Sequence, residues 1–192
     1  MPEKLTPWAR GRPTLEDTNV FIRSFTRLNV YLYSKPPSRT AKRINRAFMT
    51  LNIQLYRRSG GRILGRFGRL DAMLITTTGR RTGKERTNPV GYVYDRGRYI
   101  VCAAPGHFDV PGGPTATQPA WYLNLTADPR ATADIGPERL PVTARILEGD
   151  ERERMWRRFT DVLPFMNEFQ KRVQHRLPVV ELTPDDLTPR PL

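Results

Sequence analysis

Apolar residues recur at helical spacing in the first third of the chain. Two stripes repeat every three or four residues, and lysines and arginines occupy the other faces of the same segments. Thr18 suits the N-cap of the first helix, and Gly60–Gly61 is expected to end the second. The pattern predicts amphipathic basic helices within residues 18–60, after a flexible, proline-containing arm over residues 1–17. The first stripe consists of Phe21, Phe25, Leu28 and Leu32, and the second of Ile44, Phe48, Leu51 and Leu55.

After Arg69 the pattern changes to short β-rich runs that are separated by turns containing glycine or proline. Runs of strands joined by hairpins predict an α+β fold with an antiparallel barrel, and they argue against a doubly wound sheet. The barrel domain is expected over residues 61–183, with a C-terminal tail over residues 184–192. The expected strands cover residues 72–78, 87–94, 99–104, 130–135, 140–147 and 178–182.

Three further helices are expected among the strands. A short one covers residues 119–125 and has a proline in its first turn. A later one opens at Asp150, where Glu153 stands at the spacing of a capping box. Pro164 ends or kinks that helix, and another follows over residues 165–175.

The charge of the chain is concentrated in its first half. The protein has 192 residues and a formal net charge of +13. Residues 1–86 carry 19 Lys and Arg against 5 Asp and Glu, whereas residues 87–192 carry 13 against 14. Such an uneven distribution implies an anionic partner, which is a nucleic acid, an anionic membrane or a polyanionic small molecule. Composition alone does not choose among these three.

Cysteine and histidine are scarce in this sequence. The single Cys102 excludes an intrachain disulfide and a cysteine-based zinc cluster, and it is expected to be an inert core residue. With two histidines in the chain, we expect no metal site. No apolar segment has the length and composition of a transmembrane helix or a signal peptide, so a cytoplasmic protein is expected.

The most informative local feature is a basic turn between the first two long strands. Residues 79–87 carry three arginines and one lysine, and Gly79 and Gly83 permit the positive φ angles with which backbone N–H groups can converge on an anion. The spacing does not match a P-loop, because three residues rather than four separate Gly79 from Gly83. Taken alone, the turn is also compatible with a solvated, charged hairpin tip.

The segment Thr76–Lys84, continued by Arg86–Pro89, resembles the deazaflavin-dependent nitroreductase family, whose members are split β-barrel oxidoreductases that use coenzyme F420. The resemblance covers about residues 45–183, and its parts occur in the family's order. It implies a split antiparallel β-barrel of the FMN-binding type. Further matching segments are 55–61, 65–68, 119–125, 128–129, 141–145 and 176–182.

The resemblance also implies which residues contact the cofactor. In this family the phosphate and trailing glutamates of the cofactor lie against the basic turn, and four cations suit that long anion better than the single phosphate of FMN, the alternative cofactor. Trp121 and Asn124 match the family's Trp-Tyr-x-Asn segment and are therefore also predicted to bind the cofactor, although a core aromatic and a local cap are the competing interpretations. The tail and phosphate contacts are Arg80, Arg81, Lys84, Arg86 and Thr87, and the ring-side contacts are Pro89, Ala103 and Ala104.

The sequence departs from the family pattern on the side of the predicted ring pocket. About a dozen residues, rich in Gly and Pro, separate the 99–104 strand from Trp121 where relatives have a short Gly-Gly turn, and Leu123 replaces a family histidine. His107 is a candidate proton donor in this loop. Tyr122 and Tyr94 are candidate hydrogen-bond donors to a developing oxyanion or nitro group. The competing interpretations are a solvated histidine and two core tyrosines.

These observations predict an F420-dependent oxidoreductase. It transfers a hydride from the reduced deazaflavin to a quinone-like, nitroaromatic or other activated acceptor. The alternatives are a non-catalytic deazaflavin carrier and a basic module that binds nucleic acid or a membrane surface. A nucleic-acid binder is disfavoured because it leaves the Trp121–Tyr122 segment unexplained. The basic helices suit peripheral binding to the inner face of an anionic membrane, docking on the barrel or docking on a second subunit, and a homodimer is expected by analogy.

Overall fold

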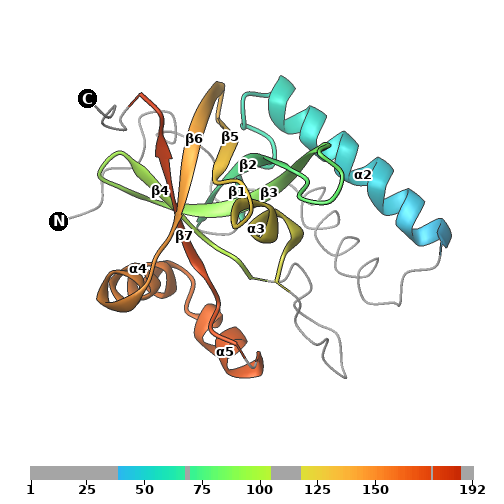
Figure 1. Cartoon of the computed structure of the whole chain (residues 1–192). Coiled ribbons are helices and arrows are strands. Elements are labelled where there is room, and N and C mark those ends of the chain that lie inside the picture. Colours follow the sequence, from blue (N-terminus) through green and yellow to red (C-terminus); the bar gives the residue numbers. More distant parts are fainter. Residues whose placement is uncertain (1–38, 68–69, 105–117, 174, 187–192) are drawn as a thin grey trace.

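The computed structural model describes residues 39–67, 70–104, 118–173 and 175–186. Its centre is a closed barrel of six antiparallel strands, in the order β2-β3-β4-β7-β6-β5, which a pairing between β2 and β5 closes (Figure 1). The short β1 adds to the outer side of β2. The predicted α+β barrel is thereby confirmed. The strands are β1 Arg66–Phe67, β2 Leu70–Thr78, β3 Glu85–Asp95, β4 Arg98–Cys102, β5 Arg130–Ile135, β6 Glu138–Ile146 and β7 Val179–Pro184.

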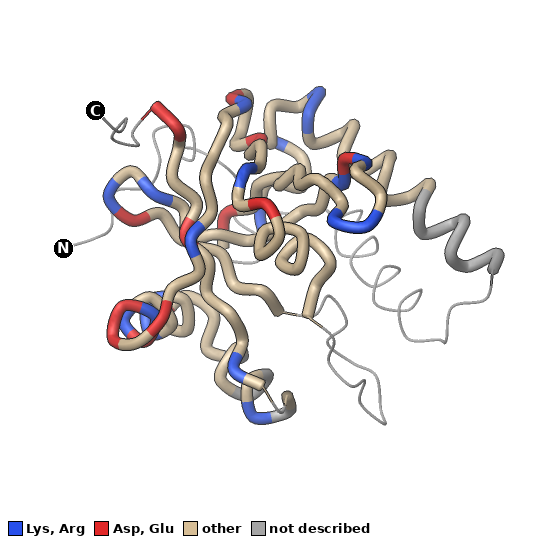
Figure 2. The backbone as a smooth tube through the Cα atoms, viewed as in Figure 1, with Lys and Arg blue, Asp and Glu red and all other residues tan. Residues whose placement is uncertain are grey.

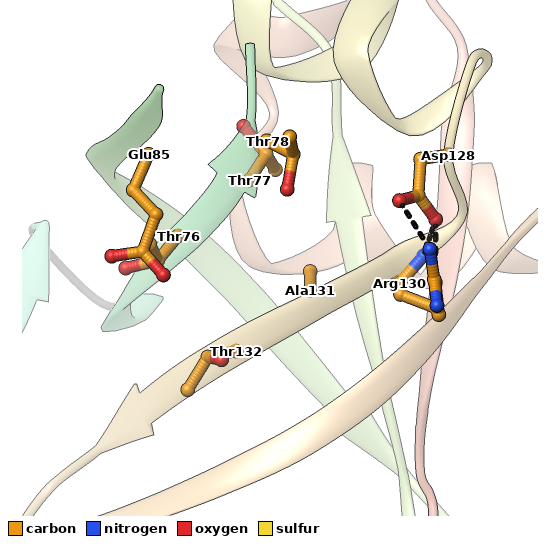
Figure 3. A pocket seen from close by; sticks show the side chains of 8 residues that line it. All are labelled: Thr76, Thr77, Thr78, Glu85, Asp128, Arg130, Ala131 and Thr132. Atoms are coloured by element: carbon orange, nitrogen blue, oxygen red, sulfur yellow. Dashed lines mark hydrogen bonds and ion pairs between the residues drawn. The ribbon is translucent and has the colours of Figure 1, made fainter. Parts of the chain in front are cut away.

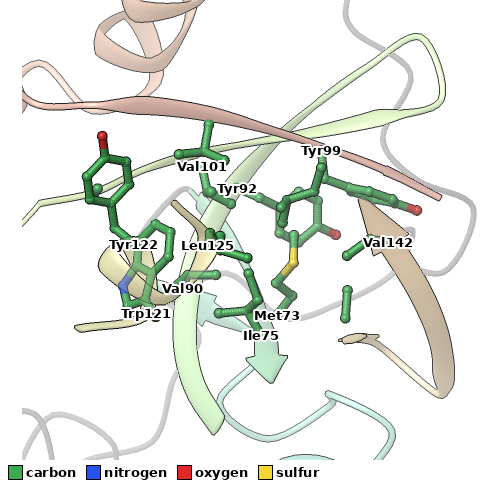
Figure 4. Packing of buried hydrophobic residues seen from close by; sticks show 14 of the residues in the cluster. Met73, Ile75, Val90, Tyr92, Tyr99, Val101, Trp121, Tyr122, Leu125 and Val142 are labelled. Carbon is green, nitrogen blue, oxygen red and sulfur yellow. The ribbon is translucent and has the colours of Figure 1, made fainter. Parts of the chain in front are cut away.

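Side chains point alternately to the two faces of each strand, and they form two separate buried clusters. Met73 and Ile75 of β2 point into the barrel, where they join one buried apolar cluster (Figure 4). A second cluster lies on the outer face, where Val93, Ile100 and Val179 meet the late helices. These helices are α4, which covers Gly149–Val162, and α5, which covers Phe165–Arg172.

The helix α3, Ala120–Leu125, packs against one end of the barrel. Trp121, Tyr122 and Leu125 from this single short helix all belong to the inner cluster. Pro119 precedes the helix, as its sequence predicted. The helix therefore closes the interior with aromatic side chains, and its C-terminal end lies next to the end of β2.

The helix α2, Arg39–Arg58, is fastened to the barrel by its C-terminal end, on the side opposite α4 and α5 (Figure 1). The Tyr56 side chain is 1% exposed, and its hydroxyl lies 3.0 Å from the carbonyl oxygen of Ala72 and 3.1 Å from that of Asp134. The same hydroxyl accepts the Gly136 N–H at 3.0 Å. One phenol thus spans the β2–β5 seam that closes the barrel.

The predicted end of α2 is confirmed. Gly60 and Gly61 both have positive φ, and the Gly61 N–H donates to the Tyr56 carbonyl at 2.8 Å, as at a glycine C-cap. The first predicted helix, the 1–17 arm and residues 105–117 of the predicted loop lie outside the described residues. Among those that are described, no helix combines the length and the apolar character needed to cross a membrane.

Some local predictions were wrong. The predicted capping box does not form, because Glu148 is the N-cap of α4 and makes no side-chain cap bond. Gly149 has φ of +54° and is the first residue of α4, so the helix begins one residue before its predicted start. Asp150 therefore lies inside the first turn, where its negative charge interacts favourably with the helix dipole. The Glu153 carboxylate instead pairs with Arg152 and Arg176. The strand β7 ends at Pro184, one residue inside the predicted tail.

Candidate functional site

The basic turn between β2 and β3 is held by bonds within itself. The Gly79 N–H donates to the Lys84 carbonyl at 2.9 Å, and the Thr82 and Gly83 N–H groups donate to the Gly79 carbonyl at 3.0 and 2.8 Å. Gly83 has φ of +64°. A Cβ at Gly79 would lie 3.0 Å from both the Lys84 oxygen and the Thr82 Oγ1, so a larger residue at this position would crowd the turn. Hydrogen bonds within the turn therefore define its shape.

These bonds correct one prediction about the turn. The backbone N–H groups do not converge on an anion, because Gly79 has no positive φ and most of the N–H groups donate inside the protein. The Arg80 N–H donates to Asn124 Oδ1 at 3.2 Å, and the Lys84 N–H to Thr82 Oγ1 at 3.4 Å. An anion at this turn must therefore be bound by side chains.

Four cationic residues of this turn are exposed, and their positions are coloured blue along the tube in Figure 2. Within the described ranges, none of them forms an ion pair with a carboxylate. Exposed cations that no protein carboxylate neutralises are available to an external anion, and guanidinium groups can meet phosphate and carboxylate with paired hydrogen bonds. These side chains belong to Arg80, Arg81, Lys84 and Arg86.

Asn124 links α3 to this turn. Its side chain is 4% exposed, accepts the Arg80 N–H through Oδ1, and donates from Nδ2 to Thr77 Oγ1 at 3.0 Å. The local-cap interpretation of this side chain is wrong, because Thr126 is the C-cap of α3 and the Asn124 carboxamide bonds to β2 and the turn. Both polar atoms of the carboxamide are bonded inside the protein.

The residues predicted to lie beside the ring come from β3 and from the segment that follows β4. Pro89 pairs with Leu74 of β2, and the β3–β4 register pairs Tyr92 with Val101. Ala103 belongs to the inner cluster, as Val90 does, whereas Ala104 packs against the outer cluster. Ala103 is fully buried, and its N–H donates to the Pro178 carbonyl at 2.8 Å.

Thr87, a predicted tail contact, lies at the start of the same strand as Pro89. It pairs with Thr76 across β2 and β3, and the two hydroxyl oxygens are 2.9 Å apart. A hydroxyl has a donor and two lone pairs, so Thr87 keeps bonding capacity beyond this contact. The hydroxyl pair lies directly beyond the turn, on the strand that also carries Arg86.

Trp121 and Tyr122 are both core aromatics. They are 6% and 8% exposed, and their rings meet edge to face with centroids 6.4 Å apart. The Tyr122 hydroxyl points away from the other residues of the inner cluster (Figure 4). Burial, and secondarily the charge of Glu148, raises the pKa of this phenol, so it stays protonated at neutral pH and can donate a hydrogen bond.

The other two predicted catalytic residues are not brought to the basic turn. Tyr94 packs on Tyr99 beside the opposite hairpin, with ring centroids 5.5 Å apart. It lies nine residues along β3 from Glu85, which corresponds to roughly 30 Å of extended strand. His107 lies outside the described residues.

A polar pocket of about 260 Å³ opens beside the turn, where β2 separates from the start of β5 (Figure 3). Sequence reasoning assigned no role to any of its lining side chains. Arg130 donates to both oxygens of Asp128 at 3.0 Å, and this bonding lowers the pKa of that carboxyl. Asp128 and Arg130, the opposite charges on either side of Pro129, are the sequence signal that could have indicated this side of the pocket. The lining residues are Thr76, Thr77, Thr78, Glu85, Asp128, Arg130, Ala131 and Thr132.

A closed antiparallel barrel that presents four exposed cations on one turn, beside an interior capped by aromatic side chains, suits the binding of a polyanionic ligand. In the described ranges, no group of three or more His, Cys, Asp or Glu side chains could hold a metal ion.

Comparisons with known proteins identify the class of this protein. The model of the F420H2-dependent quinone reductase family matches residues 48–184, and the chain belongs to this family. The F420H2-dependent quinone reductase Rv1261c of Mycobacterium tuberculosis is 31% identical over 122 residues, which cover 58% of this chain and 72% of the relative.

Two solved structures are also similar to this chain. An F420H2-dependent reductase, FDR-A, is 35% identical over 58% of this chain and 92% of its own, with a TM-score of 0.49. A structure described as a domain-swapped dimer is 31% identical over 76% of this chain and 99% of its own, with a TM-score of 0.52.

The protein is therefore an F420-dependent oxidoreductase, as the sequence predicted. The residues of the turn fit this cofactor, because a phosphate followed by glutamates needs several accessible cations and the turn supplies four. When bound, the reduced cofactor supplies the hydride, and the protein supplies binding, orientation and exclusion of water.

Proposed function

We propose that this enzyme reduces a quinone-like or nitroaromatic acceptor with reduced F420, and that the basic turn holds the cofactor's phosphate and glutamate tail. The observation that carries the proposal is the group of four exposed cations on a turn whose shape is fixed before any ligand binds. Because the N–H groups are used internally, Arg80, Arg81, Lys84 and Arg86 bind the tail with their side chains, and Thr87 extends the contact along β3.

The ring side of the site is proposed to lie where β3 and the segment after β4 run together. Pro89 and Ala104 carry small, half-buried side chains there, which allows a flat ring system to approach the backbone. Tyr122 is the proposed donor to the acceptor oxygen, because its raised pKa keeps the O–H group intact while charge develops. Trp121 supports the Tyr122 ring from the barrel interior.

A turnover assay tests this proposal. Oxidation of reduced F420 is followed with a quinone panel and a nitroaromatic panel, using the full chain, Arg80→Ala and Lys84→Ala. We expect each variant to raise the KM for the cofactor about tenfold with little change in kcat, because the tail cations act in binding rather than at the reacting atoms.

The matched control is Arg157→Ala, which removes an exposed arginine of α4 on the other side of the barrel and should leave both constants unchanged. Tight F420 binding without oxidation by either panel would contradict the enzymatic proposal and favour a carrier. A fall in kcat at constant KM in the turn variants would contradict the assignment of the cations to the tail.

We also propose that α2 binds the anionic cytoplasmic face of a membrane. Its Tyr56 faces the barrel, while Leu51 remains 50% exposed on a helix whose last turn contains Arg57 and Arg58. Apolar and basic side chains on one exposed helix suit an anionic lipid surface. Co-sedimentation with anionic vesicles should fall for Leu51→Asp and for Arg58→Glu. Equal recovery of both variants and the unchanged chain would overturn this proposal.

A homodimer is proposed as well, and the domain-swapped relative supports it. Light scattering coupled to size-exclusion chromatography measures the mass directly. A mass near twice 22.1 kDa is expected, and 22.1 kDa at all tested concentrations would contradict the proposal.

A further inference from the structure

Asn124 joins the segment that leads from α3 to β5 with the junction of β2 and the turn, which is distant in sequence. Its carboxamide binds Thr77 at the end of β2 and the Arg80 backbone in the turn, 44 residues away. Its own carbonyl accepts the N–H groups of Ala127 and Asp128 at 3.0 and 2.9 Å, on the path from α3 to β5. The side chain is 4% exposed, so water does not replace these bonds readily.

The orientation of this carboxamide follows from its partners. The Arg80 N–H can only donate, so Oδ1 must face the turn and Nδ2 must face the Thr77 hydroxyl. The remaining bonds of the turn join Gly79 with Lys84 and with residues 82 and 83, and they do not involve the Arg80 N–H. Asn124 therefore fixes the place at which the first two arginines leave the barrel.

We propose that Asn124 is a positioning residue for the basic turn and acts on the cofactor through Arg80 and Arg81, an inference that rests on the proposed function of that turn. By holding the Arg80 backbone before any ligand binds, it reduces the ordering that tail binding requires. The carboxamide makes no direct contact with the cofactor in this assignment, because both of its polar atoms are bonded within the protein.

The first test uses the ligand-free, full-length protein and amide hydrogen exchange. Asn124→Leu removes both bonds at similar volume, whereas Asn124→Asp keeps an oxygen for the Arg80 N–H and lets the Thr77 hydroxyl donate. The Arg80 amide should exchange about tenfold faster in Asn124→Leu and at the original rate in Asn124→Asp. The Ile75 amide, inside β2, should stay protected in both variants and so reports that the barrel is folded.

Unchanged Arg80 exchange in a folded Asn124→Leu protein would overturn the proposal. If that variant does not fold, Asn124→Ser replaces it, because the shorter side chain also loses the Arg80 contact and leaves less apolar bulk. For Asn124→Ser, faster amide exchange confined to the turn would support the positioning role, and unchanged exchange would contradict it.

The second test compares two ligands by fluorescence titration: oxidised F420, and the same deazaflavin with a ribityl chain but no phosphate or glutamates. Asn124→Leu should weaken F420 binding about five- to tenfold and change the affinity for the tail-less ligand less than twofold. Asn124→Asp should also weaken F420 binding, because it adds a negative charge beside the tail while the turn stays ordered.

Equal losses for both ligands would show that Asn124 supports the ring side or the barrel, and would overturn the proposal. If the unchanged protein bound the tail-less ligand as well as F420, the proposed function of the turn would fail. The exchange experiment would still report independently whether Asn124 positions Arg80.

Discussion

The tyrosines show how the position of a single residue separates a catalytic role from a packing role. Tyr122 lies on α3, and its hydroxyl points away from the inner cluster (Figure 4). Tyr94 instead packs on Tyr99, near the end of β3 that is distant from the basic turn. Both carry a phenol that could donate a hydrogen bond. If the ring lies on the proposed side, near α3 and the end of β4, Tyr122 is the better placed of these two tyrosines to serve an acceptor.

Replacing each hydroxyl by hydrogen tests this distinction. We expect Tyr122→Phe to lower kcat with a quinone by about ten- to a hundredfold, because a donor to developing charge is lost. Tyr94→Phe should retain the original kcat and KM. Steady-state kinetics with reduced F420 measure both, and equal behaviour of the two variants would contradict the assignment.

The thiol of Cys102 leads to a second prediction at the scale of single residues, which concerns the stability of the protein at high pH. Burial raises the pKa of its thiol from 9.0 to about 12, and burial with nearby charges raises that of Tyr99 from 10.0 to about 12. The unfolded chain releases these protons first, so the free energy of unfolding falls as pH rises from about 9 to 12, by about 1.4 kcal/mol per unit for each group.

Urea unfolding at a series of pH values measures this fall. Cys102→Ala should reduce the slope from about pH 9 to 12, and the slope should nearly vanish between about pH 9 and 10, where the thiol acts without the phenol. An identical slope in the variant would show that the thiol is not desolvated in the folded protein. The thiol of the folded protein should also react slowly with alkylating reagents near neutral pH, because little thiolate is present.

At the scale of elements, Tyr56 anchors α2 to the barrel seam, beside an ion pair between Arg57 and Asp134. The Tyr56 hydroxyl is the acceptor for the Gly136 N–H, and its O–H is within reach of two strand carbonyls. Tyr56→Phe should lower the free energy of unfolding by roughly 2 kcal/mol, because a buried N–H loses its acceptor. Urea denaturation measures this loss, with Tyr94→Phe as the control, and equal stabilities would contradict the anchoring role.

Elements with strong local signals could be predicted from the sequence. Strand alternation, the apolar stripe of α2, the proline before α3 and the two glycines after α2 each determine local structure, and the structure confirms them. The capping box failed because its spacing does not reveal that Gly149 adopts positive φ and starts α4 earlier. The two-residue β1 carries too few positions for any pattern.

The candidate site could likewise be predicted from the sequence only in part. The cations of the turn could be predicted, because four of them are close in sequence and the flanking strands are clear. The polar pocket could not, because Thr132 and Thr76 become neighbours only through the β2–β5 pairing that closes the barrel. The role of the Asn124 side chain likewise depends on the distant Arg80 backbone, which no local pattern indicates.

At the scale of the whole molecule, the excess positive charge of the first half has one proposed use on the barrel, which is to bind the cofactor tail. The turn cations are exposed, so their attraction to an anionic tail is screened by salt. The Kd for F420 should rise steadily as ionic strength increases from roughly 20 to 500 mM, and the rise should be less steep for Arg80→Ala and Lys84→Ala. Fluorescence titration at several salt concentrations measures both slopes, and parallel slopes would contradict a tail-binding role.

The most direct test of the account is a titration of the full chain with oxidised F420 and with FMN, repeated for Arg80→Ala and Lys84→Ala. The account predicts that F420 binds more tightly than FMN, and that each substitution weakens F420 about tenfold and FMN less, because FMN has one phosphate and no glutamate chain. Tighter binding of FMN, or F420 binding that both substitutions leave unchanged, would contradict it.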